Sequence, residues 1–154
     1  MEVAFTLHLP RDAMSVPVVR QLCRSTFKSL GIEDDCVHDL ELDITEACTN
    51  VLKHATDTGE AYEVEVWTSG STCDIRVRDR GQGFDPARYG SSRDARATAE
   101  GGRGIELMRV LVDSLSFSSE GDSGTMVHLE KSLALRQDSP LKVIGSFAPK
   151  AARA

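Results

Sequence analysis

The segment ELDITEACTNVLKHA, residues 41–55, places a carboxylate, a carboxamide and an imidazole four residues apart, at Glu46, Asn50 and His54. Residues four apart on an α-helix are separated by about 40° around its axis, so the three side chains would form one line, bordered by Asp43. A carboxylate and a carboxamide on this line could hold a hard cation, or one could bind metal while the other accepts a proton. The alternative interpretation is a solvated helix face that ends in a histidine.

A second candidate is the segment DRGQGF, residues 79–84, which directly follows a predicted strand. Asp79 is expected at the C-terminal end of that strand. Gly81 and Gly83 would allow the backbone to approach a ligand closely, or to turn with positive φ. A glycine-rich turn after a strand is common in proteins and is the alternative interpretation of these residues.

A third candidate is the segment GGRGIELM, residues 101–108, in which Gly102 and Gly104 come just before a predicted helix. Free backbone N–H groups at a helix N-terminus bind anions, aided by the helix dipole. Arg103 could add a charge-assisted contact to a phosphate. A flexible loop that meets a helix is the alternative, and neither glycine segment contains the GxxxxGKS/T motif of a P-loop.

A fourth segment, GDSGTMVHL at residues 121–129, places Gly124 and Thr125 at the start of a predicted strand. The turn before the strand would by itself explain the glycine. The hydroxyl of Thr125 is therefore only a candidate contact to a ligand.

The elements that must position these residues follow from hydrophobic periodicity and turn residues. Alternating apolar residues predict strands, and Gly70-Ser71 is a tight hairpin signal between two of them. The segment 80–103 is rich in glycine and serine, shows little periodicity and is predicted to be a long loop. The predicted strands are 3–9, 62–69, 72–79, 114–119 and 125–133, and the predicted helices are 13–30, 33–55 and 104–112.

Early helices followed by antiparallel hairpins predict an α+β fold. The expected architecture is a two-layer α/β sandwich, with helices on one face of a mixed, mainly antiparallel sheet. The 154 residues fit a single domain. We expect this domain to span residues 1–135, followed by a C-terminal tail, residues 136–154, that is partly mobile.

Composition and charge limit the classes of function. The formal net charge of −6 argues against general nucleic-acid binding, which needs a basic face, but permits a local cationic pocket for phosphate. No apolar stretch approaches the roughly 20 residues of a membrane span. The cysteines fit no zinc-ligand spacing and are expected to be free, buried thiols in a reducing compartment, so we expect a cytoplasmic protein. They are Cys23, Cys36, Cys48 and Cys73.

The order of the four candidate segments is more specific than any one of them. An acid-amide helix, a strand ending in Asp-x-Gly-x-Gly, a long loop, a glycine-rich helix start and a Gly-Thr strand follow one another over residues 3–133. This order resembles the GHKL ATPase superfamily. The resemblance implies the Bergerat-type ATP-binding fold for the domain of residues 1–135.

The resemblance implies roles for the first helix and the strand end. Asn50 would coordinate a Mg²⁺ ion that bridges the phosphates of ATP, and Glu46 would be the general base that orients or deprotonates the attacking hydroxyl. Asp79 would accept a hydrogen bond from the adenine amino group, and Gly81 and Gly83 would give the base room. The line on the helix would then form one wall of a nucleotide pocket.

The same resemblance implies that the second half of the chain contacts the triphosphate. Residues 85–101 would form a lid over it, the following glycine-rich residues would cradle the phosphates, and the Gly-Thr strand would lie near the adenine. His54 is expected to be structural. The residues implied to contact phosphate or adenine here are Gly102, Arg103, Gly104, Ile105 and Thr125.

The segment EACTNVLKHA is similar to the same region of the bacterial anti-sigma-factor serine kinases. This similarity implies partner switching, in which the kinase binds a sigma factor and a STAS-domain anti-anti-sigma protein competes for the kinase. The kinase inactivates that competitor by phosphorylating a serine. A homodimer is expected from the resemblance, with no direct nucleic-acid partner and no membrane partner.

Three other functions remain open at this level. A nucleotide-dependent binding switch that phosphorylates nothing would have nearly the same sequence, although Glu46 favours a kinase because a pure binder needs no base. A histidine-kinase-type catalytic domain needs a phosphoacceptor histidine on a dimerising helix, whereas His38 lies on the Glu46 helix itself. A plain α+β interaction domain would not bind ATP with Mg²⁺.

Overall fold

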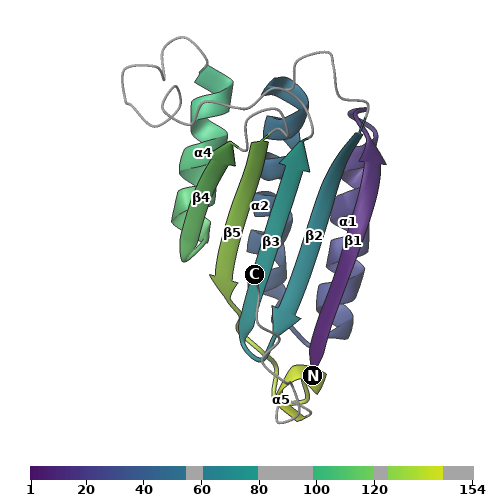
Figure 1. Cartoon of the computed structure of the whole chain (residues 1–154). Helices are drawn as coiled ribbons and strands as arrows, with labels where there is room; N and C mark the ends of the chain where they lie inside the picture. The colour runs from purple at the N-terminus through teal and green to yellow at the C-terminus, as the bar shows by residue number, and fades with distance from the viewer. Residues whose placement is uncertain (55–60, 80–98, 120–124, 144–154) are drawn as a thin grey trace.

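The computed structural model describes residues 1–54, 61–79, 99–119 and 125–143 of the chain. These residues form a five-stranded sheet in the order β1-β2-β3-β5-β4, with helices packed on one of its faces (Figure 1). The strands are β1 (Glu2–Pro10), β2 (Ala61–Ser69), β3 (Thr72–Asp79), β4 (Ser114–Ser119) and β5 (Thr125–Ser132). The helices are α1 (Ser15–Ser29), α2 (Asp34–His54), α4 (Ala99–Leu111) and the short α5 (Pro140–Val143).

This arrangement confirms the predicted two-layer α+β sandwich. All four pairs of neighbouring strands in the described sheet are antiparallel, whereas the sequence predicted a mixed, mainly antiparallel sheet. The hairpin between β2 and β3 turns at Gly70, whose φ of 57° is a conformation that glycine adopts without strain. Among the helices of the described ranges, none combines the length and the apolar character needed to cross a membrane.

α2 forms because its sequence combines an acidic first turn with an apolar stripe. Asp34 and Asp35 lie in the first turn, where carboxylates interact favourably with the helix dipole. The stripe recurs every three to four residues and packs α2 against its neighbours, and burying each such side chain contributes about 1.5–3 kcal/mol. The buried residues of the stripe are Val37, Leu40, Ile44, Cys48 and Val51.

Alternation along the strands gives the sheet two different faces. On β3, the side chains of Ile75 and Val77 are buried under the helices, and those of Asp74, Arg76 and Arg78 belong to the opposite face. The apolar face continues onto the neighbouring strands in register. The hydrophobic core therefore lies between the sheet and the helices, and it is mostly aliphatic. As predicted, all four cysteines are free and buried.

α4 begins at Ala99, well before the predicted start at Gly104, so the end of the predicted loop is in fact helical. Adjacent glycines have low helix propensity, which is why this segment resembles a loop in the sequence. Ile105 and Met108 of α4 are buried in the core, and such packing supplies most of the stability of a helix in a protein. Residues 80–98 of the predicted loop lie outside the described residues.

The chain after β5 returns to the junction between α1 and α2. The hydroxyl of Ser139 donates a hydrogen bond of 2.6 Å to the carbonyl oxygen of Leu30, and Leu141 is buried. Gly31 has a φ of 71° and lies so close that a Cβ atom on it would be 2.7 Å from the Cα of Ser139. The first residues of the predicted tail thus pack against the domain, and residues 144–154 lie outside the described part.

Candidate functional site

The predicted site residues that the structure describes lie towards one end of the sandwich, the upper end in Figure 1. α2 and β3 both end there, so Asn50 lies in the final turns of α2 and Asp79 is the last residue of β3. α4 and β5 start from the same end, which brings Gly104 and Thr125 towards it. Because two elements end and two elements start at this end of the sandwich, residues that are far apart in the sequence lie near one another there.

The acid-amide line of α2 carries a buried amide group. Asn50 is only 5% exposed, and its Nδ2 atom has no hydrogen-bond partner within the described residues. Leaving a buried polar atom without a partner costs about 1–3 kcal/mol, so such an atom marks a position where a bound group is expected. Glu46, one turn earlier, is half-buried, and His54 is the last residue of the helix. The side chain of His54 lies outside the described part.

Gly104 of α4 faces the carboxylate of Glu46 where the two helices meet. A Cβ atom at position 104 would overlap Oε2 of Glu46 and would lie 3.3 Å from its Cδ. The φ angle of Gly104 is not positive, so glycine is needed here for space and not for backbone conformation. The glycine therefore makes room for the Glu46 carboxylate between α2 and α4.

Because α4 starts at Ala99 and not at Gly104, fewer of the backbone N–H groups of residues 102–105 are free to bind an anion. In a helix that begins at Ala99, only the first four backbone N–H groups, up to Gly102, lack an acceptor within the helix. The following N–H groups bond inside the helix, so the prediction of glycines just before a helix start is wrong in its position. Ile105 is 3% exposed and belongs to the hydrophobic core, whereas the side chain of Arg103 lies outside the described part.

Asp79 is the last residue of β3, as the sequence predicted, and it is buried beside a cationic neighbour that the sequence did not indicate. The guanidinium of Arg11 lies 3.9 Å from Asp79 Oδ1 and donates a hydrogen bond of 3.4 Å to the carbonyl oxygen of Val51. Arg11 is itself only 10% exposed in its side chain. It thus links the end of β1 to the last turns of α2 and to the carboxylate at the strand end. A lone arginine after Pro10 carries no pattern that would have revealed this role.

Asp43 is the second unpaired polar residue of the α2 wall. It is 0% exposed, and neither carboxylate oxygen has a hydrogen-bond partner among the described residues. Burial raises the pKa of Asp43 to about 7, with Lys131 lowering it and Asp39 raising it by smaller amounts. Residues seven apart are about 20° apart around a helix, so Asp43 lies two turns below Asn50 on the same line. The sequence placed Asp43 beside the line but did not predict its burial.

The remaining predicted contacts fall partly outside the described structure. Gly81, Gly83 and the predicted lid up to residue 98 are not among the described residues. Thr125 is confirmed as the first residue of β5 and is paired with Ser119, but its side chain is not described. The described site therefore consists of one α2 wall, the end of β3 with its arginine and the glycine of α4.

The fold and this site define a class of protein. An α+β sandwich with a polar wall on one helix, a buried aspartate at a strand end and a glycine that clears space for a carboxylate agrees with the ATP-binding fold that the sequence resembles. Residues 9–131 match the family described as the Histidine kinase-like ATPase domain. The chain therefore belongs to the histidine kinase-like ATPase family.

Relatives of the chain with similar length are kinases by name. The Serine-protein kinase RsbW of Halalkalibacterium halodurans is 30% identical over 132 residues, which cover 81% of this chain and 80% of that protein. The Serine-protein kinase RsbW of Bacillus velezensis is 29% identical over 136 residues, covering 82% and 84% of the two chains.

A solved structure shows the same fold. The crystal structure of the RsbU and RsbW domains of a Mycobacterium tuberculosis protein superimposes with a TM-score of 0.61 at 20% identity. The match covers 84% of this chain and 32% of that longer chain. At this identity the likeness supports the fold and not a shared activity.

Proposed function

We propose that the chain is an ATP-dependent serine protein kinase that acts as an anti-sigma factor. The observation that carries this function is the pairing of Glu46 with Gly104, because a carboxylate accommodated between two helices beside an unpaired buried amide suits proton transfer at a nucleotide site. A protein that only binds nucleotide has no need for such a carboxylate. The family and the names of its relatives support the same conclusion.

Membership of an ATPase family implies the use of ATP, and we infer that Mg²⁺ accompanies it. The residues at the upper end of the sandwich fit Mg-ATP, because the amide oxygen of Asn50 can ligate the ion and its buried Nδ2 atom, which has no partner among the described residues, can donate a hydrogen bond to a phosphate oxygen. Amide and carboxylate oxygens are ligands that suit hard cations. When bound, Mg²⁺ neutralises charge on the phosphates, which favours phosphoryl transfer. Asn50 is the residue we expect to hold it.

The other described polar residues of the site also have roles in this proposal. Glu46 orients the serine hydroxyl of the protein substrate and accepts its proton during attack. Asp79 accepts a hydrogen bond from the adenine amino group, and Arg11 positions that carboxylate. Phosphoryl transfer depends mainly on positioning and charge neutralisation, so small displacements of these side chains should reduce the rate strongly.

The glycine-rich segments complete the proposed pocket. Gly81 and Gly83 give the adenine room, and Thr125 lies near it at the start of β5. Gly102 and Arg103 contact the phosphates from the first turns of α4, Gly104 clears space for Glu46, and Ile105 anchors this part of α4 in the core. We assign all of these residues to one ATP-binding kinase domain, residues 1–135.

The proposed partners follow from the resemblance of the EACTNVLKHA segment, and the names of the relatives support the serine kinase activity. They are a sigma factor, which the chain sequesters, and a STAS-domain anti-anti-sigma protein, which it phosphorylates on serine. We further propose that the chain acts as a homodimer in the cytoplasm. Nucleic acid and membrane are not partners in this proposal.

The test combines partner capture with phosphosite mapping. The tagged chain is used to capture partners from lysate of its host, Mg-ATP is added, and the captured proteins are analysed by mass spectrometry. We expect a small STAS-domain protein to gain phosphoserine. A captured partner that gains no phosphate, on a chain that still binds ATP, would instead establish a nucleotide-dependent binding switch.

Two variants test the residue roles in the same assay. Asn50→Ala should lose Mg-ATP binding, whereas Glu46→Gln should keep binding and lose phosphotransfer by about 100-fold or more, as expected for a general base. Glu41→Gln is a matched control, because Glu41 is another partly buried acid on α2 and pairs with Arg24 at 3.7 Å. Equal phosphotransfer in wild type and Glu46→Gln would refute the base assignment.

A further inference from the structure

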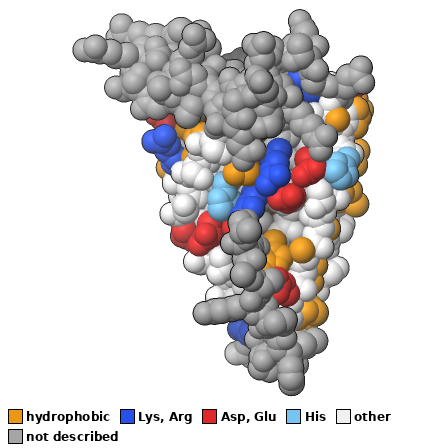
Figure 2. Space-filling view, viewed as in Figure 1, with side chains coloured by type: hydrophobic (Ala, Val, Ile, Leu, Met, Phe, Trp, Pro, Cys, Tyr) orange, Lys and Arg blue, Asp and Glu red, His pale blue; other side chains and the backbone are white. Residues whose placement is uncertain are grey.

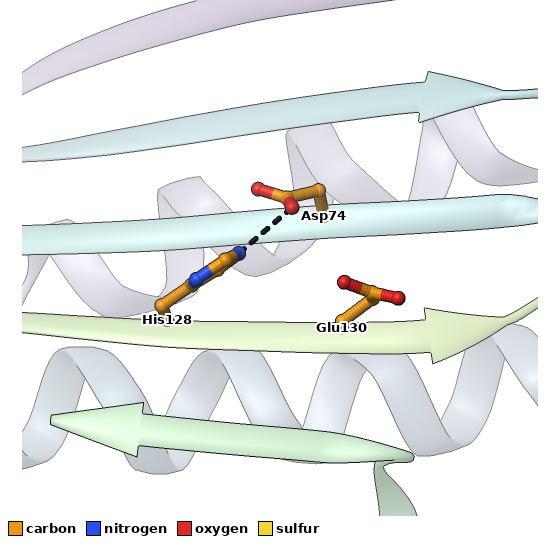
Figure 3. Close-up of side chains that lie close together, drawn as sticks. All are labelled: Asp74, His128 and Glu130. Atoms are coloured by element: carbon orange, nitrogen blue, oxygen red, sulfur yellow. Dashed lines mark hydrogen bonds and ion pairs between the residues drawn. The ribbon is translucent and has the colours of Figure 1, made fainter. Parts of the chain in front are cut away.

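The face of the sheet that the helices leave uncovered carries a dense set of charged and histidine side chains (Figure 2). Three of them form a compact group, namely Asp74 on β3 with His128 and Glu130 on β5 (Figure 3). Asp74 lies directly opposite Glu130 in the antiparallel register. The group therefore belongs to rigid, paired strands and lies on the face opposite to the proposed nucleotide site.

The potential metal-ligand atoms of the three side chains lie close to one another. His128 Nε2 lies 2.7 Å from Asp74 Oδ2, and one ligand atom from each residue lies within 4.8 Å of the other two. In a tetrahedral zinc site, bond lengths of about 2.0–2.2 Å place ligand atoms about 3.3–3.6 Å apart. Side-chain adjustments of the order of an ångström would thus bring this group to coordinating distance.

The neighbours of Asp74 direct one of its oxygens towards this group. The Nε atom of Arg76 lies 3.3 Å from Asp74 Oδ1, while Oδ2 faces His128. Asp74 is 7% exposed, so its carboxylate is held in place, whereas Glu130 is exposed and can swing inward. Carboxylates that bind metal are commonly oriented by such a contact to their other oxygen.

We propose that Asp74, His128 and Glu130 bind a divalent transition-metal ion, with Zn²⁺ as the best-fitting chemistry. An imidazole nitrogen combined with two carboxylates suits Zn²⁺ and its neighbours in the first transition series better than Mg²⁺, which prefers oxygen ligands. Three protein ligands leave a coordination position for water or for a group from another molecule. The ion would replace the contact between His128 and Asp74 and would cross-link β3 to β5.

The site is tested by titrating the full-length chain, freed of metal with EDTA, with ZnCl₂ in a calorimeter. The wild type should bind one Zn²⁺ ion, and His128→Gln should bind it at least about tenfold more weakly. His8→Gln is the matched control, because His8 lies on the same face and pairs with one carboxylate, Glu63, at 3.2 Å. We expect His8→Gln to bind as the wild type does.

A second variant controls for the possibility that His128→Gln weakens Zn²⁺ binding only because it disturbs the fold. Glu130 is exposed, so Glu130→Gln should leave the fold intact, as circular dichroism will show, and should also weaken Zn²⁺ binding about tenfold or more. The proposal is overturned if the wild type shows no saturable Zn²⁺ binding. Unchanged affinity in His128→Gln or in Glu130→Gln would also overturn it.

The free cysteines require one more measurement, because thiolates also bind zinc. Co²⁺ is substituted for Zn²⁺ and the absorption spectrum is recorded for the folded chain. Nitrogen and oxygen ligation, with no thiolate charge-transfer band, is the expected result, since all four cysteines are buried. A thiolate band that persists in His128→Gln would place the metal on cysteine and would overturn the proposal.

Discussion

The two faces of the sheet differ in the polar side chains that they carry. On the helix-covered side, two buried polar groups of α2 have no hydrogen-bond partner among the described residues, namely the carboxylate of Asp43 and the Nδ2 atom of Asn50. On the open side, charged groups pair across strands, for example His8 with Glu63 at 3.2 Å and Arg78 with Glu65 at 3.9 Å. The two buried groups of α2 therefore oppose folding, whereas each of these open-face pairs brings a carboxylate close to a basic side chain.

This difference indicates where function has shaped the protein. A buried polar group without a partner destabilises the folded state, so it marks a candidate position for a ligand or a reaction. An exposed ion pair contributes about 0–1 kcal/mol and by itself indicates nothing about function. The α2 wall therefore supports the proposed nucleotide site more strongly than the larger number of charges on the open face does.

Truncation in the core should produce the largest effect. Ile75 of β3 is 1% exposed under the helices, and Ile75→Ala should lower the free energy of unfolding by about 2–5 kcal/mol, because it leaves a cavity. Urea denaturation measures this loss. A loss below about 1 kcal/mol, comparable to that of an exposed pair, would contradict the proposed division between the two faces.

Gly104→Ala should lower the rate of phosphotransfer while leaving the stability of the fold almost unchanged. The added methyl group meets the flexible end of Glu46, so the side chain moves and the helix survives. A displacement of about 1 Å at a reacting group can reduce a rate by roughly 100-fold, so phosphotransfer should fall by about that factor while the melting temperature changes little. Val110→Ala, at an exposed position of α4, is the control. Full activity in Gly104→Ala would show that Glu46 does not need this space.

Asp43 should make stability depend on pH. Its pKa is raised to about 7 in the folded chain, so the folded state retains a proton that the unfolded state loses at lower pH, and ionisation of Asp43 opposes folding. This contribution reduces stability as pH rises from about 4 to 7, and the loss persists above pH 7. Asp43→Asn should be more stable than the wild type by roughly 1–3 kcal/mol at pH 8, and by less at pH 5.

Urea denaturation of both proteins at the two pH values measures this difference. Asp35→Asn, an exposed change in the first turn of the same helix, should shift stability equally at both pH values. If the advantage of Asp43→Asn is the same at pH 5 and pH 8, then the ionisation of Asp43 is not the cause.

The smallest effect is expected on the open face. Glu65→Gln removes the pairing with Arg78 at 3.9 Å, where both side chains are at least a third exposed. The free energy of unfolding should change by less than about 1 kcal/mol, and less still in high salt. A loss of several kcal/mol would mean that this face is buried against another surface.

Several features could be predicted from the sequence because they depend on local chemistry. The apolar stripe of α2 and the alternation in β2 and β3 follow from periods of 3.6 and 2 residues. The positions of Asp79 and Thr125 at strand ends follow from the turn residues beside them. The start of α4 was missed because packing of Ile105 and Met108 overrides the low helix propensity of the preceding glycines.

The sequence by itself determined the strands, the two long helices α1 and α2, the acid-amide line on α2 and the resemblance to an ATPase family, because periodicity and motif order are properties of neighbouring residues. Only the tertiary structure decided which distant groups meet. Arg11 reaches Asp79, Gly104 makes room for Glu46, and His128 meets Asp74 because antiparallel packing brings separate elements together. Burial of Asp43 likewise depends on what α2 packs against, since a helix alone would leave it in water.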